Sequence, residues 1–382
     1  MAVEGNMSRA ARTGMPAAPQ VNRYIRRYRQ AVGQNIGQPR TIEELVIANE
    51  DRLTKPKPDQ PPERFLLYDS AEDDGYQGKR MLIFSSDWGL MQLANGQHWF
   101  ADGTFKAAPA LFTQLYTLHT CVLGQTFPCV YALLVDKTER TYRQLLSVVR
   151  EAILERFPDT DFVGSILIDL EIAAKNAIRA VFPEKELKLC FFHMSQAVWR
   201  KVQELGLQAA YAADADFALK LRCLPAIAFL QEADIPDGFG EVGRQLPDEA
   251  VELLPYFERT YIGHDVAGRW IPPLFEPREW CQYDRTLAGL ARTTNALEGW
   301  HHGFQSRLAC NHPSTATLLR TLRDEEDTGR AELDKLIRGL EPGRRRQWVV
   351  LAARVQRTVE RRQDGELSVT ELVRGIAHNF AF

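Results

Sequence analysis

The sequence predicts a mixed α/β fold, a sheet flanked by helices, with an α-helical insertion late in the core. Three observations predict it. Between residues 98 and 134, three runs rich in branched and aromatic residues follow one another, as in an antiparallel meander. Between residues 139 and 206, helix-like and strand-like segments alternate. Between residues 208 and 291, the strand pattern fades and helical spacing replaces it.

The first expected elements are short. The run MLIF (81–84) predicts a strand, and SSDWGLMQLANG predicts a helix with its cap among residues 85–87 and its end at Asn95-Gly96. The three strands of the meander are HWFADGTF, LYTLHTCVL and FPCVYALLV, and the turn GQT joins the last two.

The alternating part begins with an amphipathic helix, ERTYRQLLSVVREAILERF. Its apolar stripe consists of Tyr142, Leu145, Leu146, Val149, Ile153 and Phe157. A strand (SILID), a helix (EIAAKNAIRAVF), a strand (LKLCFFH) and a helix (MSQAVWRKVQELG) that ends at Gly206 follow it. Three antiparallel strands followed by this alternation are the order expected of a ribonuclease-H-like core.

The chain divides into five expected segments. The Pro-rich run TKPKPDQPPER predicts a linker, and the helix ARTTNALEGWHHGFQSRLA, with apolar residues at helical spacing, predicts a return to the core. The segments are a basic N-terminal arm with its linker (1–64), the first part of the RNase-H-like core (65–207), an all-α insertion (208–291), the resumed core (292–320) and a C-terminal helical region (321–382).

Composition excludes several classes of protein. A chain of 382 residues with 45% hydrophobic residues and a net charge of −3 is typical of an ordinary globular protein. Its six cysteines form no CxxC pair, which argues against a disulfide framework and a zinc ribbon. No apolar run is long enough for a membrane span or a secretion signal, so we expect an intracellular protein with no membrane partner.

The N-terminal arm is locally basic. Up to Arg40 it holds seven arginines against the single acid Glu4. The run NRYIRRYRQ interleaves aromatic rings with guanidinium groups, which suits a polyanion such as DNA. A solvated, partly helical arm explains the pattern equally well. The residues expected to bind DNA are Arg23, Arg26, Arg27 and Arg29.

Three acidic residues are candidates for a catalytic metal site. Asp102 and Asp169 are predicted to end neighbouring strands, and an ionised side chain of a buried strand can only emerge at its end. Glu298 lies in the first turn of the resumed helix. Converging carboxylates repel one another unless a dication lies among them, which predicts Mg²⁺ or Mn²⁺, as two ions about 4 Å apart.

Each acid also has a structural explanation. Asp102-Gly103 could form a turn, Asp169 could cap the following helix, and Asn295 with Glu298 resembles a capping box.

Five segments together resemble a known family. HWFADGTFKAAPALFTQLYTLH, YALLVDKTERTY, LIDLEIAAKNAIRAVFP, LCFFHMSQAVWRKVQELGL and TTNALEGWHHGF are similar to the MULE transposase domain, the catalytic core of Mutator-like DNA transposases, over about residues 65–308. The resemblance implies that Asp102, Asp169 and Glu298 are the catalytic and metal-binding acids of a DDE site. It also implies an RNase-H-like fold, an all-α insertion and cut-and-paste transfer of DNA.

Four other residues are expected near these acids. Cys190 and His193 fit the family's C-x-x-H motif, and we favour a hydrogen-bonding role near the site over half of a metal site. Glu171 is expected to be structural or to support the site, and His301 lies on the helix face of Glu298. Trp199 and Trp300 are expected in the core rather than as platforms for bases.

The expected function is a Mg²⁺-dependent DDE transposase, active or decayed, in the nucleus, acting on transposon ends and target DNA as a homo-oligomer. No paired Cys and His ligands precede Phe65, so the FLYWCH finger of the animal branch is missing or lies outside this chain. The alternatives are a transposon-derived DNA-binding or regulatory protein without catalysis, and a structural α/β module with incidental acids.

Overall fold

The computed structural model describes residues 39–57, 61–340 and 346–382. The arginines expected to bind DNA lie outside these residues: Arg23, Arg26, Arg27 and Arg29. Within the described part of the chain, no helix has both the length and the apolarity needed to span a bilayer.

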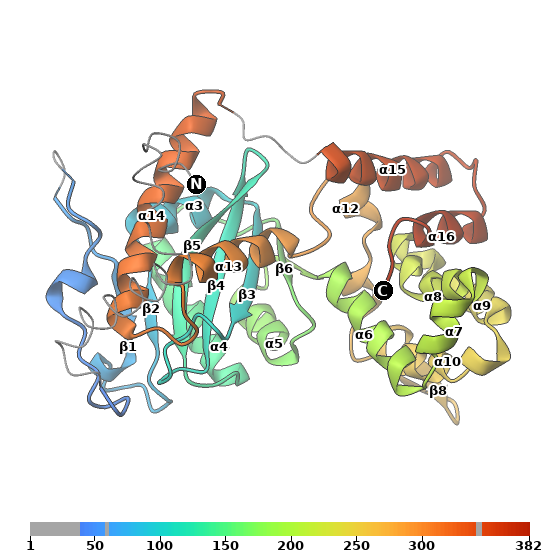
Figure 1. The fold of residues 1–382 in the computed structure, drawn as a ribbon, viewed down its shortest axis with the longest axis horizontal. Helices are drawn as coiled ribbons and strands as arrows, with labels where there is room; N and C mark the ends of the chain where they lie inside the picture. The colour runs from blue at the N-terminus through green and yellow to red at the C-terminus, as the bar shows by residue number, and fades with distance from the viewer. Residues whose placement is uncertain (1–38, 58–60, 341–345) are drawn as a thin grey trace, which may run out of the picture.

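A seven-stranded mixed sheet lies at the centre of the fold (Figure 1). Its strand order is β1-β2-β5-β4-β3-β6-β7, antiparallel from β1 to β3 and parallel from β3 to β7. The meander and the strand MLIF are confirmed, whereas β1 was not expected. The strands are β1 Leu66–Asp69, β2 Leu82–Phe84, β3 His98–Thr104, β4 Gln114–Val122, β5 Gln125–Leu134, β6 Ser165–Ile168 and β7 Glu186–Leu189.

Helices cover both faces of the sheet, as predicted for a ribonuclease-H-like fold. Alternate residues of each strand point to opposite faces, so Trp99 of β3 packs in the larger core while its neighbour Phe100 packs with Leu297 on the other face. The first face carries α3 Asp87–Asn95, α4 Glu139–Arg156 and α5 Ile172–Val181, and the second carries α13 Asn295–Leu308 and α14 Thr315–Ile337.

Two helices on the sheet begin at serines that cap them. Ser86 accepts a hydrogen bond from the Gly89 amide at 3.1 Å and begins α3, which ends at Asn95 as predicted. Ser314 caps α14 in the same way, with the amide of Thr317 at 3.2 Å. The predicted apolar stripe of α4 is buried from Tyr142 to Ile153.

The predicted strand LKLCFFH is wrong in its second half. β7 ends at Leu189, and α6 Phe191–Glu204 begins directly after Cys190. The Met194 amide donates to the Cys190 carbonyl at 3.1 Å, which closes the first helical turn. A short apolar run cannot distinguish a strand from the buried start of a helix. His193 therefore lies in the first turn of α6.

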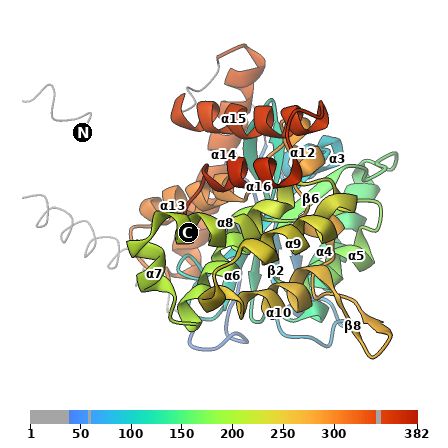
Figure 2. The same cartoon turned by 90° about the vertical axis from the view of Figure 1, so that its right-hand side faces the viewer.

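Residues 205–291, which follow α6, form a helical lobe beside the sheet (Figures 1 and 2). An antiparallel hairpin of β8 His264–Val266 and β9 Arg269–Ile271, which was not expected, interrupts its helices. The C-terminal helices α15 Arg346–Gln363 and α16 Val369–Ala377 also pack on the lobe, while α14 stays on the sheet. The lobe's own helices are α7 Gln208–Ala213, α8 Ala215–Ala226, α9 Ile235–Gln245, α10 Leu253–Phe257, α11 Pro277–Trp280 and α12 Tyr283–Leu287.

The segment before β1 packs against the sheet and α14. Leu45 and Ile47 are buried in the same cluster as Phe65. The Thr54 amide donates to the Glu63 carbonyl at 2.8 Å, so the chain runs antiparallel on the two sides of the Pro-rich segment. The described residues before β1 therefore belong to the body of the fold.

Candidate active site

Strand register places Asp102 and Asp169 side by side. β3 and β6 are parallel neighbours in which Phe100 pairs with Leu167. Two residues further along the chain, Asp102 still lies in β3, whereas Asp169 lies one residue beyond the end of β6. Burial and then the nearby charge of Asp102 raise the pKa of Asp169, so the two carboxyl groups are neighbours. The period of two puts the Asp102 side chain on the face of Phe100. That face is the one that α13 covers through Leu297.

The prediction that β3 ends at Asp102 is wrong. Asp102 still pairs with Thr117 of β4, and β3 continues to Thr104. The pairing with β6 stops earlier, because β6 ends at Ile168. Asp102 is therefore flanked by a strand on one side only. Since it lies within a strand, the explanation of Asp102-Gly103 as a turn is also wrong.

Asp169 lies in a crowded acidic environment. Burial and the nearby charges of Asp102 and Glu171 raise its pKa from 3.8 to about 6, although His193 and Lys137 oppose the shift. Asp169 is not a helix cap, because α5 begins at Ile172 with Glu171 at the N-cap position. The capping explanation of Asp169 is thus wrong, and its carboxyl is left facing other acids.

Glu298 approaches the same face from α13. Its Oε1 lies 3.9 Å from His193 Nε2, and its side chain is 41% exposed. One turn later, His301 Nε2 lies 3.4 Å from Asp102 Oδ2. The capping-box explanation of Glu298 is wrong, because the N-cap of α13 is Thr294 rather than Asn295. The helix thus brings Glu298 and His301 to the aspartates' side of the sheet.

Cys190 and His193 join the beginnings of α6 and α13. Buried Cys190 accepts hydrogen bonds from the amide and the hydroxyl of Thr294, at 3.3 and 3.4 Å. Burial would raise the pKa of Cys190, but His193 and Thr294 outweigh it and lower the pKa. Burial would lower the pKa of His193, but Cys190, Asp169 and Asp102 outweigh it and raise the pKa to about 9. Cys190 and His193 thus favour each other's charged forms, and His193 also lies close enough to Asp169 and Asp102 for their charges to raise its pKa.

Glu171 is held by side chains that were not expected at the site. The Tyr142 hydroxyl donates to its Oε1 at 2.9 Å, and Lys137 Nζ lies 3.0 Å from its Oε2. Gln114 in turn donates to the Tyr142 hydroxyl at 2.8 Å. In the sequence, the one sign that Lys137 belongs near the site was its position shortly after β5, which ends at the same edge of the sheet as β3.

The two expected core tryptophans pack against other rings. Trp199 stacks on Phe382, and Trp300 stacks on Phe304, with ring centroids 5.6 and 4.8 Å apart. The Trp300 Nε1 also donates to Glu325 at 2.8 Å. These contacts occupy both side chains within the protein.

The aspartate pair has the donor chemistry of a Mg²⁺ site. Nowhere among residues 39–57, 61–340 and 346–382 do three or more His, Cys, Asp or Glu side chains stand together as a ready-made metal cluster. Mg²⁺ commonly takes one or two carboxylates and fills its shell with waters and substrate phosphates. Asp102 and Asp169 fit that requirement, and the raised pKa of Asp169 reflects a negative charge in need of compensation.

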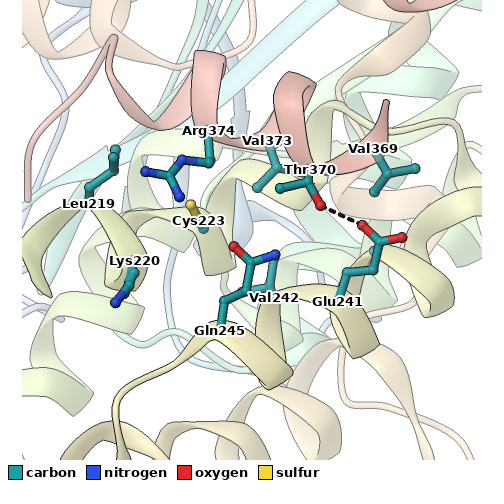
Figure 3. Close-up of a pocket in the computed structure, with 11 residues that line it drawn as sticks. Leu219, Lys220, Cys223, Glu241, Val242, Gln245, Val369, Thr370, Val373 and Arg374 are labelled. Atoms are coloured by element: carbon teal, nitrogen blue, oxygen red, sulfur yellow. Dashed lines mark hydrogen bonds between the residues drawn. The ribbon is translucent and has the colours of Figure 1, made fainter. Parts of the chain in front are cut away.

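A small cavity lies elsewhere, in the helical lobe between α8, α9 and α16 (Figure 3). The hydroxyl of Thr370 donates to Glu241 across its edge at 2.7 Å. The cavity holds about 10 Å³, which is room for a single water. A nucleotide does not fit there.

The order of this mixed sheet, with helices on both faces and Asp102 and Asp169 near the carboxyl ends of the parallel neighbours β3 and β6, is that of an RNase-H-like α/β fold. Residues 98–197 match the family model of the MULE transposase domain. The matched segment contains Asp102, Asp169, Cys190 and His193, while Glu298 lies beyond it. No curated protein matches the chain. The match relates this part of the chain to transposases, and in general terms to proteins that bind DNA.

Proposed function

We propose that the chain is a Mutator-like DDE transposase that catalyses metal-dependent cleavage and transfer of DNA strands. The observation that supports this proposal most directly is the parallel pairing of β3 with β6, because Asp102 lies in β3 and Asp169 lies one residue beyond β6, near enough for the charge of Asp102 to act on Asp169. As part of the same proposal, the protein acts in the nucleus, as a homo-oligomer, on transposon ends and target DNA.

Each acid has a role in this proposal. Asp102 and Asp169 hold Mg²⁺ or Mn²⁺, and Glu298 completes the site by turning its exposed carboxylate from His193 toward them. Bound ions would supply the activation of a water, and then of a 3′-hydroxyl, together with charge for the leaving oxygen. His193 and Lys137 balance part of the acidic charge around Asp169.

Nicking of supercoiled plasmid DNA in Mn²⁺ tests the proposal. We expect nicking by the full chain and a loss of at least about 100-fold in Asp102→Asn and Asp169→Asn, because each variant removes a carboxylate ligand. Asp159→Asn changes an exposed acid in the loop before β6 and serves as the matched control. Equal nicking by wild type and Asp102→Asn would refute the assignment.

A second candidate is a transposon-derived DNA-binding protein without catalysis. The observation that favours it is that Asp102 and Glu298 each lie near a histidine, at 3.4 and 3.9 Å. Under this alternative, DNA binding persists in Asp102→Asn while neither wild type nor variant binds Mn²⁺ in a titration followed by calorimetry. Mn²⁺ binding that disappears in Asp102→Asn supports the transposase instead.

A further inference from the structure

An aromatic side chain stands exposed beside the acids. Phe105 follows β3 directly, three residues after Asp102, and its side chain is 48% exposed. A flat partner stacked on this ring would remove apolar surface from water, which is favourable. Lys106, the next residue, is also exposed.

The loop that carries Phe105 is fixed to the body of the fold. The Ala108 amide donates to the Phe105 carbonyl at 3.2 Å, and Ala107 and Ala108 are buried under α13 and α14. The His312 amide donates to the Lys106 carbonyl at 2.8 Å and ties this loop to the segment after α13. The backbone that carries the Phe105 ring is therefore held in place.

A lysine links the ring to the acids. Lys137 Nζ lies 5.2 Å from the centre of the Phe105 ring and 3.0 Å from Glu171 Oε2. Its charge also lowers the pKa of Asp169 against the stronger effects that raise it. A positive charge with hydrogens to donate thus lies between an exposed aromatic face and the candidate metal ligands.

We propose that Phe105 and Lys137 form a nucleotide-binding subsite, in which a DNA base stacks on the Phe105 ring and a neighbouring phosphate binds the Lys137 ammonium. The proposal rests on the proposed function and adds where the strand lies relative to the acids. The occupant is an unpaired nucleotide, because both faces of a base inside a duplex are covered by its neighbours. Charge complementarity favours this side of the acids, since the carboxylates themselves repel phosphate.

Binding of a fluorescent 12-nucleotide oligothymidylate to the full chain, in Ca²⁺ buffer, tests the stacking. We expect Phe105→Ala to weaken binding about 5-fold to 100-fold, the range typical of one lost base stack, and Phe105→Tyr to bind within about 2-fold of wild type. Trp270→Ala is the matched control, because Trp270 is 58% exposed on the β8–β9 hairpin in the lobe. Equal losses in Phe105→Ala and Trp270→Ala would overturn the proposal.

Photocrosslinking locates the base independently of affinity. With 5-iodouracil in the oligonucleotide, we expect the crosslinked peptide found by mass spectrometry to contain Phe105, and the crosslink to disappear in Phe105→Ala. Crosslinks only at other peptides contradict the subsite.

The salt dependence of the same binding tests the lysine. Lys137→Gln should lower the slope of log affinity against log salt by about 0.7, the value for one phosphate contact on a single strand. Lys335→Gln, an exposed lysine near the end of α14, should leave the slope unchanged. A wild-type chain that neither binds DNA nor nicks it refutes the proposed function. A chain that nicks DNA but binds it equally well in Phe105→Ala refutes the subsite alone.

Discussion

At the scale of one residue, Asp169 shows that burying a carboxylate beside other acids costs free energy of folding. Its pKa of about 6 means that the folded chain holds this carboxylate less favourably than the unfolded chain does. The protonated carboxyl stabilises the fold below about pH 4, and this contribution is lost as the pH rises through about 6. The dication of the proposed function would offset this cost.

Removing that charge should stabilise the protein near neutral pH. We expect Asp169→Asn to raise the free energy of unfolding by about 2 kcal/mol at pH 7.5 without divalent ions, with the gain vanishing toward pH 3.5. Urea unfolding at both pH values measures it, with Asp159→Asn as the control that should show no gain. A gain that is equal at both pH values would contradict the electrostatic cause.

The effect of Mn²⁺ on the free energy of unfolding of the same variant tests whether Asp169 binds the ion. If Asp169 is a ligand, adding Mn²⁺ stabilises wild type more than Asp169→Asn, because only a chain that binds the ion gains from mass action. Identical Mn²⁺ effects on the two chains would show that Asp169 does not bind it.

At the scale of elements, the alignment of β3 with β6 depends on Gly164. Its φ is +99°, and a Cβ there would lie 2.0 Å from the backbone oxygen of Gln97, the residue before β3. The Ser165 amide donates to that same Gln97 carbonyl at 2.9 Å. Any larger residue must push the beginnings of β3 and β6 apart, and with them the two aspartates.

Gly164→Ala should therefore separate the acids without touching them. We expect it to lower the free energy of unfolding by about 3 kcal/mol, from an unfavourable φ and a backbone clash. Gly206→Ala is the control, since Gly206 also has a positive φ, +74°, but nothing lies near its Cβ position, so about 1 kcal/mol is expected. Equal losses in the two variants by urea unfolding would show that the contact with Gln97 is unimportant.

At the scale of the whole molecule, one core runs from the sheet into the helical lobe. Met194, Val198 and Val202 of α6 belong to the same cluster as residues of the sheet and of the lobe. The C-terminal helix α16 packs mainly on α8, α9 and α15, all in the lobe. The end of the chain therefore stabilises the lobe more directly than it stabilises the sheet.

Leu372→Ala tests whether α16 stabilises the lobe more directly than the sheet. Leu372 is buried in α16, and its truncation should cost about 3 kcal/mol. We expect hydrogen exchange to rise more in α8 than in β4, because α16 packs mainly on helices of the lobe, α8 among them. An equal rise in both elements would show that the lobe and the sheet unfold only together.

Much of this arrangement was predictable from sequence because it depends on local patterns. The alternation of strands and helices, the stripe of α4 and the cap at Ser86 are set by residues near one another in the chain. The three acids could be singled out as candidates because Asp102 and Asp169 follow apolar runs and Glu298 lies in the first turn of a helix, patterns that are visible without any contact information.

The sequence by itself determined the order of most helices and strands of the core, though not β1 or the β8–β9 hairpin, and the acids worth testing, since periodicity and charge act over a few residues. Only the tertiary structure decided that Asp102 lies within β3, that Cys190 stands between the end of β7 and the beginning of α6, and that Lys137 lies between Phe105 and Glu171. These facts depend on pairing between strands and on packing between residues far apart in the chain, and no local pattern encodes which distant side chain will be the neighbour.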